Sequence, residues 1–214
     1  MPPLIIARQW LDDYAEKAFR ELCGIDRRPK RLASLWEKAL RLRDEATGDW
    51  QCRFTWRSFR QFSLQGDTLE IEGIRFVSGD LAGYGEQQID EILVYLFRGP
   101  AWQAEEGLPT IELLLKNNWA SAYVMAAFKY LRQYFSRRLF PDQALSPSLA
   151  PGYGFSCRQV EAFFQLVNGG AIGIELTEEG LIRPFNSCVG LYLVYRRPRL
   201  ELPFGENPAG KVSQ

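Results

Sequence analysis

The feature that most constrains this fold is a change in the spacing of apolar residues after the N-terminal segment 1–46. Within that segment, apolar residues recur about every four positions, which is typical of amphipathic helices. From Trp50 to Trp56 they alternate with polar residues, which indicates a half-buried strand. A chain that changes period in this way combines helices with a sheet, so we expect an α+β fold.

Two helices are expected at the N-terminus. The first runs from Leu4 to Leu22, and Gly24 and Pro29 separate it from a second one between Leu32 and Leu42. A turn at 47–49 then leads into the sheet.

One segment of the sheet carries the clearest strand signal. Ile92–Phe97 is an uninterrupted apolar run, which predicts a strand covered on both faces and therefore central. A turn at Gln65–Asp67 precedes alternation around Leu69, and Ser78–Asp80 predicts a short helical turn. Further strands are expected around Arg75–Phe76, Ile172–Leu176 and Val189–Tyr195.

A long helix is expected from Thr110 to Leu139, with an apolar side typical of a core helix and a bend where two asparagines adjoin. The breakers in Pro141–Gly154 predict an irregular loop, and Ser156 is a candidate cap for a helix through Val167. Together these elements predict a largely antiparallel twisted sheet with a long helix and an N-terminal helical region. The expected organisation is a helical region at 1–46, an α+β domain at 47–196 and a poorly ordered tail at 197–214.

The chain contains no histidine, which excludes Ser-His-Asp and Cys-His catalysis, histidine metal ligands and an imidazole ligand to a corrin or haem. Its four cysteines are too widely spaced for a redox pair or a zinc ribbon, so we expect reduced thiols in a cytoplasmic protein and no metal site. The formal net charge is zero, which argues against non-specific nucleic-acid binding. No signal-peptide core or membrane span is expected.

The segment Ala150, Pro151, Gly152, Tyr153, Gly154 is a candidate ligand loop. Proline restricts the backbone, and glycines on both sides of Tyr153 let the chain turn and approach a ligand closely. Exposed amides and one tyrosine suit a small polar ligand. On composition alone, a structural turn with a packed tyrosine is the favoured alternative.

A second candidate segment is acidic. Glu178 and Glu179 lie between apolar strands, where they are candidates for binding an amine or for paired acid/base chemistry in a hydrolase. A solvated turn is the simpler interpretation, and the hydrolase ranks last among the functions considered.

The two segments together resemble the activation domain of cobalamin-dependent methionine synthase and its free-standing bacterial relatives. That family carries Pro-Gly-Tyr, a helix, Ile-Gly-Val, Leu-Thr-Glu-Ser, an apolar pair, a proline and Ser-Val-Ser-Gly. The corresponding elements here are Pro151–Tyr153, Ile172–Ile174, Leu176–Glu179, Leu181–Ile182, Pro184 and Ser187–Gly190, with no gap between Leu176 and Gly190.

The resemblance implies binding of S-adenosylmethionine and docking on a separate corrinoid-binding protein, or on a methionine synthase that lacks its activation domain. Such a module supports reductive remethylation of inactive cobalamin, with a reductant protein as a further partner, and the cofactors carry the reactive atoms. It implies no catalytic residue in this chain. It places Ala150–Gly154, Glu178 and Tyr192 at the ligand site.

The sequence departs from the family pattern at one position of particular interest. Ser148 stands where the family usually has an arginine suited to gripping the methionine carboxylate, and Glu179, Asn186 and Cys188 replace other motif residues. An alternative function is therefore a non-catalytic partner of a corrinoid methyltransferase that has lost S-adenosylmethionine binding. Whether another arginine, such as Arg158 or Arg183, replaces the missing one is open at this point.

Overall fold

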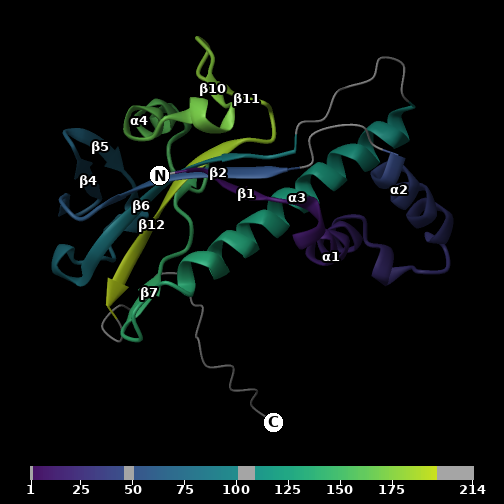
Figure 1. The fold of residues 1–214 in the computed structure, drawn as a ribbon, viewed down its shortest axis with the longest axis horizontal. Helices are drawn as coiled ribbons and strands as arrows, with labels where there is room; N and C mark the ends of the chain where they lie inside the picture. Colours follow the sequence, from purple (N-terminus) through teal and green to yellow (C-terminus); the bar gives the residue numbers. More distant parts are fainter. Residues whose placement is uncertain (1, 46–50, 101–108, 197–214) are drawn as a thin grey trace.

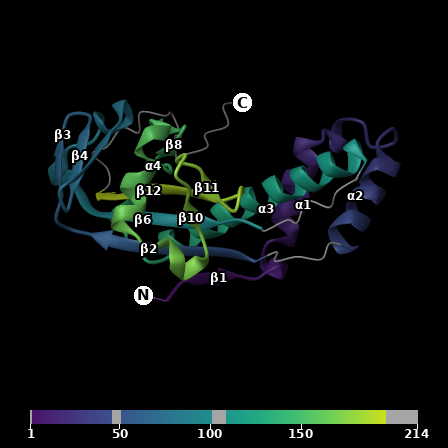
Figure 2. The ribbon, with the colours of Figure 1, turned by 90° about the horizontal axis from the view of Figure 1, so that it is seen from above.

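The computed structural model describes residues 2–45, 51–100 and 109–196. A curved antiparallel sheet forms its centre, with three long helices on one face and a short helix with a small second sheet on the other (Figure 1). Viewed from above, the N-terminal helices gather at one end of the molecule and the small sheet lies at the opposite end (Figure 2). This arrangement confirms the α+β class.

The main sheet has five strands in the order β1-β2-β6-β12-β7, all paired antiparallel. β6 occupies the middle position, and Ile92–Phe97 within it is buried throughout, which confirms the prediction of a central strand. The strand bounds are β1 (Leu4–Ile6), β2 (Cys52–Phe59), β6 (Ile89–Arg98), β12 (Cys188–Arg196) and β7 (Gln143–Leu145).

The long helix α3 packs diagonally across one face of the sheet, with α1 and α2 beside it (Figure 1). It continues through both asparagines at 117 and 118. The side chain of Ser156 accepts a hydrogen bond from the Arg158 amide and caps the 3-10 turn Cys157–Gln159. The helix α4 follows this turn with Gln159 as its N-cap, so Ser156 does not cap the helix itself as predicted. The helices are α1 (Asp12–Leu22), α2 (Ala33–Glu45), α3 (Thr110–Ser136) and α4 (Val160–Leu166), with 3-10 turns η1 (Arg8–Trp10), η2 (Ile25–Arg27), η3 (Gly79–Leu81), η4 (Glu86–Gln88), η5 (Cys157–Gln159) and η6 (Gly169–Ile172).

The smaller strands form three additional units. The turn between β3 and β4 contains Gly66, whose φ of 61° is in the left-handed region that glycine adopts readily. The units are the sheet β3 (Ser63–Gln65), β4 (Thr68–Ile71) and β5 (Ile74–Val77), the hairpin β10 (Glu175–Leu176) and β11 (Ile182–Arg183), and the short parallel pair β8 (Ala150–Pro151) and β9 (Gly154–Phe155).

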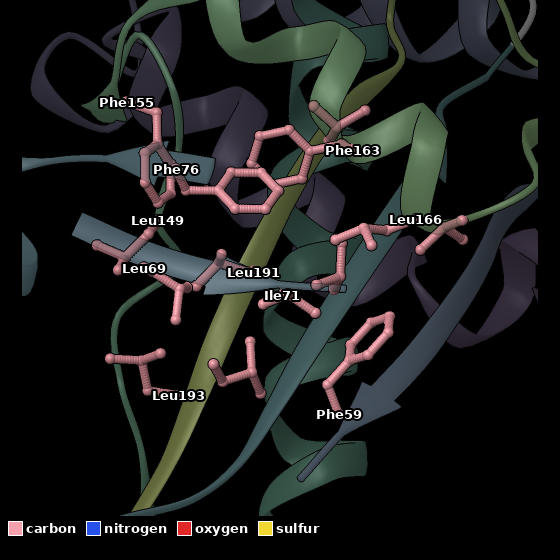
Figure 3. Close-up of a cluster of buried hydrophobic side chains, with 14 of the residues drawn as sticks. Phe59, Leu69, Ile71, Phe76, Leu149, Phe155, Phe163, Leu166, Leu191 and Leu193 are labelled. Atoms are coloured by element: carbon pink, nitrogen blue, oxygen red, sulfur yellow. The ribbon is translucent and has the colours of Figure 1, made fainter. Parts of the chain in front are cut away.

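Alternation along the central strands builds a core on each face of the main sheet. Phe54, Tyr95 and Tyr192 point toward α3, where the N-terminal helices contribute to the same core. Val94 and Leu191 point to the other face and join α4, β4 and β5 (Figure 3). We call these the helical-face core and the opposite-face core.

Three other predictions made from sequence were wrong in whole or in part. Leu4–Ile6 is a strand and not the first turn of a helix, because its backbone pairs with Cys52–Phe54 of β2; the helix begins only at Asp12. Part of Pro141–Gly154 is regular, because Gln143–Leu145 pairs with the end of β12 and both flanking prolines lie outside the paired residues. Ile172 ends a 3-10 turn, so the strand expected from it begins at Glu175.

Some expectations concern residues outside the described ranges. The turn at 47–49 and the tail at 197–214 are among them, and so is the proposed boundary after residue 46. The domain division therefore stays a prediction. Within the described ranges, no helix combines the length and apolarity needed to cross a membrane, and no group of three or more acidic or cysteine side chains gathers as metal ligands would.

Candidate functional site

The candidate loop Ala150–Gly154 is held in shape by its own backbone. The Ala150 amide donates to the Tyr153 carbonyl at 2.9 Å, and the Tyr153 amide donates back to the Ala150 carbonyl at 2.8 Å. The Gly152 amide donates to the carbonyl of Phe155 at 2.8 Å. These bonds close a tight turn whose shape does not depend on a bound molecule.

The two glycines of the loop have different roles. Gly152 has φ 85°, and a Cβ at this position would have no atom within 4 Å, so the space beside it is open. Gly154 has φ 102°, and a Cβ there would lie 2.7 Å from Oδ2 of Asp80. Glycine is required at Gly154 because L side chains rarely adopt this φ, and the carboxylate of Asp80 lies directly against the loop backbone there.

Tyr153 is the most exposed part of this loop, with 81% of its surface accessible. Its side chain is therefore not packed in the way that the purely structural interpretation of the turn requires. Large exposed aromatic side chains are typical contact residues for a ligand or partner.

The base of the loop is bound to β12. Leu149 exchanges two backbone hydrogen bonds with Leu191, at 3.0 and 2.8 Å, and the fully buried Ser146 extends this pairing to Leu193. The segment between β7 and β8 therefore continues along the edge of β12. It fixes where the loop begins.

Ser148 connects the base of the loop to the interior of the sheet. Its hydroxyl lies 2.6 Å from the phenol oxygen of Tyr95, and the ring centroid of Tyr95 lies 5.3 Å from that of Tyr192. Burial raises the pKa of Tyr192 to about 12 and raises that of the fully buried Tyr95 well above its ordinary range. Both phenols are therefore neutral at physiological pH, and either hydroxyl of the Ser148–Tyr95 pair can be the donor.

Gly190 makes room for this arrangement. It is paired with Tyr95 across β12 and β6, and a Cβ on it would lie 2.5 Å from the Tyr95 phenol oxygen and 2.8 Å from the Leu149 carbonyl oxygen. The glycine that ends the motif Ser187–Gly190 is therefore required by close packing against the base of the candidate loop.

Of the predicted site residues, the structure brings Ala150–Gly154 together as one loop. Tyr192 is 2% exposed in the helical-face core, where its ring packs beside that of Tyr95, the residue that contacts Ser148. Glu178 is exposed in the turn of the β10–β11 hairpin, where the hydrogen bonds join Thr177, Gly180 and Leu181.

The neighbouring Glu179 does not have the character of a general acid. A hydrogen bond with Thr177 lowers its carboxyl pKa, and the side chain is fully exposed. A general acid needs a raised pKa in a protected position. The geometry of this hairpin gives no support to the hydrolase hypothesis.

Two charged residues near the loop were not found from the sequence. Asp80 comes from η3, and Arg132 comes from α3, more than a dozen residues before the loop. Nη1 of Arg132 donates to the Ser146 carbonyl at 3.0 Å, and Nη2 donates to that of Leu145 at 3.4 Å. The sequence patterns of α3 and η3 predict a helix and a turn, but they do not predict that Arg132 and Asp80 lie near the loop.

A separate open cavity of about 870 Å³ lies on the sheet beyond the end of α3. Its lining combines aromatic side chains with an ion pair in which Nε of Arg196 lies 2.8 Å from Oδ1 of Asp90. None of the residues predicted from the sequence as site residues lines it. The lining includes Trp56, Tyr134, Phe135, Phe140, Asp90 and Arg196.

Comparison with known proteins shows a similarity at the level of the fold. No family model matches the chain, and no curated protein sequence matches it. A solved structure described as "Crystal Structure of the MetH Reactivation Domain bound to AdoHcy" is similar, with 15% sequence identity and a TM-score of 0.51. The match covers 94% of this chain and 81% of that chain. At this identity it shows a shared fold, which confirms the resemblance at that level.

Proposed function

We propose that this chain is a stand-alone module that binds S-adenosylmethionine at the loop Ala150–Gly154 and docks on a corrinoid protein to support reductive remethylation of its inactive cobalamin. The observation that carries the proposal is the agreement of two independent likenesses. The motif run from Leu176 to Gly190 resembles the activation-domain family, and the fold resembles a reactivation domain that was solved with AdoHcy.

The loop has the features such a ligand requires. The open space beside Gly152 admits a molecule close to the backbone, and the exposed ring of Tyr153 offers an aromatic surface. When bound, S-adenosylmethionine supplies the methyl group. The residues of this chain bind and orient it, and they need no histidine for that role.

Calorimetric titration of the chain with S-adenosylmethionine tests the ligand part of the proposal. We expect saturable binding that Tyr153→Ala weakens several-fold, because an aromatic contact contributes about 0.5–1.5 kcal/mol. Phe140→Ala is the matched control, since Phe140 is an exposed aromatic side chain, 70% accessible, that lies outside the loop. The absence of binding heat at millimolar ligand would reject this part.

Co-purification with a corrinoid-binding protein tests the docking part. We expect a complex that forms with the corrinoid protein and not with an unrelated protein of similar charge. Failure to form it would reject docking even if S-adenosylmethionine binds.

A second candidate function is supported by Ser148. The hydroxyl of Ser148 is committed to Tyr95 at the position where the family usually has an arginine. A chain without that contact can serve as a non-catalytic partner of a corrinoid methyltransferase. This alternative predicts a complex whose affinity does not change when S-adenosylmethionine is added.

A further inference from the structure

The side chain of Arg132 has no carboxylate partner among the residues that the structure describes. It is half-buried on α3, and its hydrogen bonds in the described ranges go to the carbonyls of Ser146 and Leu145. A guanidinium carries five N–H groups, and the two bonds to these carbonyls use two of them. Within the described ranges, the other three have no hydrogen-bond acceptor, and a carboxylate is the acceptor whose geometry suits them best.

The position of this cation relates it to the candidate loop. Ser146 and Leu145 lie two and three residues before Ser148, so the guanidinium sits near the base of the loop. Burial raises the pKa of Tyr192 and of Tyr84 to about 12, and the nearby positive charge of Arg132 reduces that rise in both phenols. Tyr192 lies on one face of the sheet and Tyr84 on the other, so Arg132 is at the sheet edge where the loop begins.

Three other arginines are each paired with an acidic side chain. Arg57 pairs with Glu72, Arg196 pairs with Asp90, and Arg43 pairs with Asp44. Arg158 and Arg183 are exposed, in η5 and β11. Arg132 combines partial burial, proximity to the loop and the lack of an acidic partner.

We propose that Arg132 is the carboxylate-recognising residue of the candidate site, supplying from α3 the guanidinium that Ser148 does not supply from the loop. The inference rests on the proposed function, because the ligand carboxylate is that of the methionine part of S-adenosylmethionine. The two carbonyl bonds hold the guanidinium plane at the loop base, and its remaining N–H groups donate to the carboxylate.

The test compares S-adenosylmethionine with decarboxylated S-adenosylmethionine, which retains the sulfonium and the adenosine. We expect the unmodified chain to bind the carboxylated compound about 10- to 100-fold more tightly, the usual contribution of a charge-assisted contact. Arg132→Gln should remove this preference while binding of the decarboxylated compound is unchanged. Arg132→Lys should retain part of it, since a lysine keeps the charge but not the planar fork.

Arg137→Gln is the matched control. Arg137 follows the last residue of α3, is exposed and lies outside the loop, so the preference should persist in this variant. Circular dichroism and thermal melting of all variants establish that they are folded.

The alternative outcomes separate the two proposals. If Arg132→Gln keeps the full preference for the carboxylated compound, the assignment of Arg132 is wrong while the proposed function stands. If Arg132→Gln weakens both compounds by the same factor, Arg132 only supports the loop, and the inference is again overturned. If neither compound binds the unmodified chain, the proposed ligand and this inference fail together.

Discussion

The two cores of the main sheet are built from different side-chain chemistry. The helical-face core contains aromatic side chains with polar groups that find specific partners: the Trp119 indole donates to the Ala39 carbonyl at 2.8 Å, and the Tyr123 phenol donates to Asp12 at 2.6 Å. The opposite-face core consists mainly of aliphatic side chains and phenylalanines, such as the group around Phe163 (Figure 3).

This difference has a consequence for the candidate site. Polar groups in a core fix geometry, because each must keep its partner, whereas apolar packing stabilises without specifying one atom pair. The base of the loop is held by both kinds of interaction. Ser148 hydrogen-bonds to Tyr95 on the helical face, while Leu149 and Phe155 pack on the opposite face. The loop therefore bridges the edge of the sheet with one polar and two apolar anchors.

Among single substitutions, the largest effect is expected from a cavity in the opposite-face core. Phe163 is fully buried and its ring lies 4.9 Å from that of Phe76 and 5.8 Å from that of Phe155. Phe163→Ala should lower the free energy of unfolding by about 3–5 kcal/mol, measured by urea denaturation. Phe140→Ala, at an exposed aromatic, should change it by less than about 0.5 kcal/mol. Similar losses in the two variants would contradict the packing described for this face.

A further effect is expected at alkaline pH, where deprotonation of groups in the helical-face core should lower the free energy of unfolding. Burial raises the pKa of the Cys188 thiol from 9.0 to about 12 and that of Tyr192 from 10.0 to about 12. Both groups stay protonated in the folded state while the unfolded chain loses its protons, so stability is fully present below pH 9 and falls between pH 9 and 12. Each group contributes a slope of about 1.4 kcal/mol per pH unit within its own window.

Urea midpoints measured across this range check that expectation. Tyr192→Phe should make the decline shallower above pH 10, because phenylalanine has no proton to lose. A decline that is equally steep in this variant would mean that other groups control the alkaline transition.

A smaller effect is expected at the polar anchor of the loop. Tyr95→Phe and Ser148→Ala each remove one partner of the 2.6 Å contact and should each cost about 1 kcal/mol. Because both variants break the same bond, the double variant should cost less than the sum. Denaturation of the three variants measures the coupling, and strict additivity would show that the contact does not stabilise the fold.

The smallest effect is expected from a surface ion pair on the second sheet. Nε of Arg75 lies 3.0 Å from Oε2 of Glu70, and both side chains are substantially exposed. Arg75→Ala should change the free energy of unfolding by less than about 0.5 kcal/mol, and added salt should reduce that difference further. A loss above 1 kcal/mol in the same denaturation measurement would give this pair a role that its exposure does not explain.

The sequence predicted the elements whose own pattern defines them. The apolar run Ile92–Phe97, the alternation from Cys52 and the long helix from Thr110 each have enough residues for a period to be visible. Leu4–Ile6 and Gln143–Leu145 are only three residues long, and each becomes a strand because a longer neighbour offers its edge. Pattern within such a short segment cannot predict pairing with a distant one.

The candidate site also has one part that local sequence predicts and another part that it does not. The loop Ala150–Gly154 was predictable because proline and glycine act locally on the backbone. The partners Tyr95, Asp80 and Arg132 were not, because their positions beside the loop follow from the crossing of α3, β6 and η3 over long sequence separations. The resemblance to a known family predicted the fold. The assignment of Ala150–Gly154, Glu178 and Tyr192 to a ligand site stays a prediction.

The short outer strands of the main sheet affect how the molecule behaves in a crowded solution. A sheet edge exposes unpaired amides and carbonyls on which another chain can add a strand. Here the three longest strands lie inside the sheet, and β1 and β7, which border it, pair over three residues each. An incoming chain would find little backbone to pair with on either side. The short length of β1 and β7 is the reason that their pattern was not visible in the sequence. The same short length protects the main sheet from edge-to-edge aggregation.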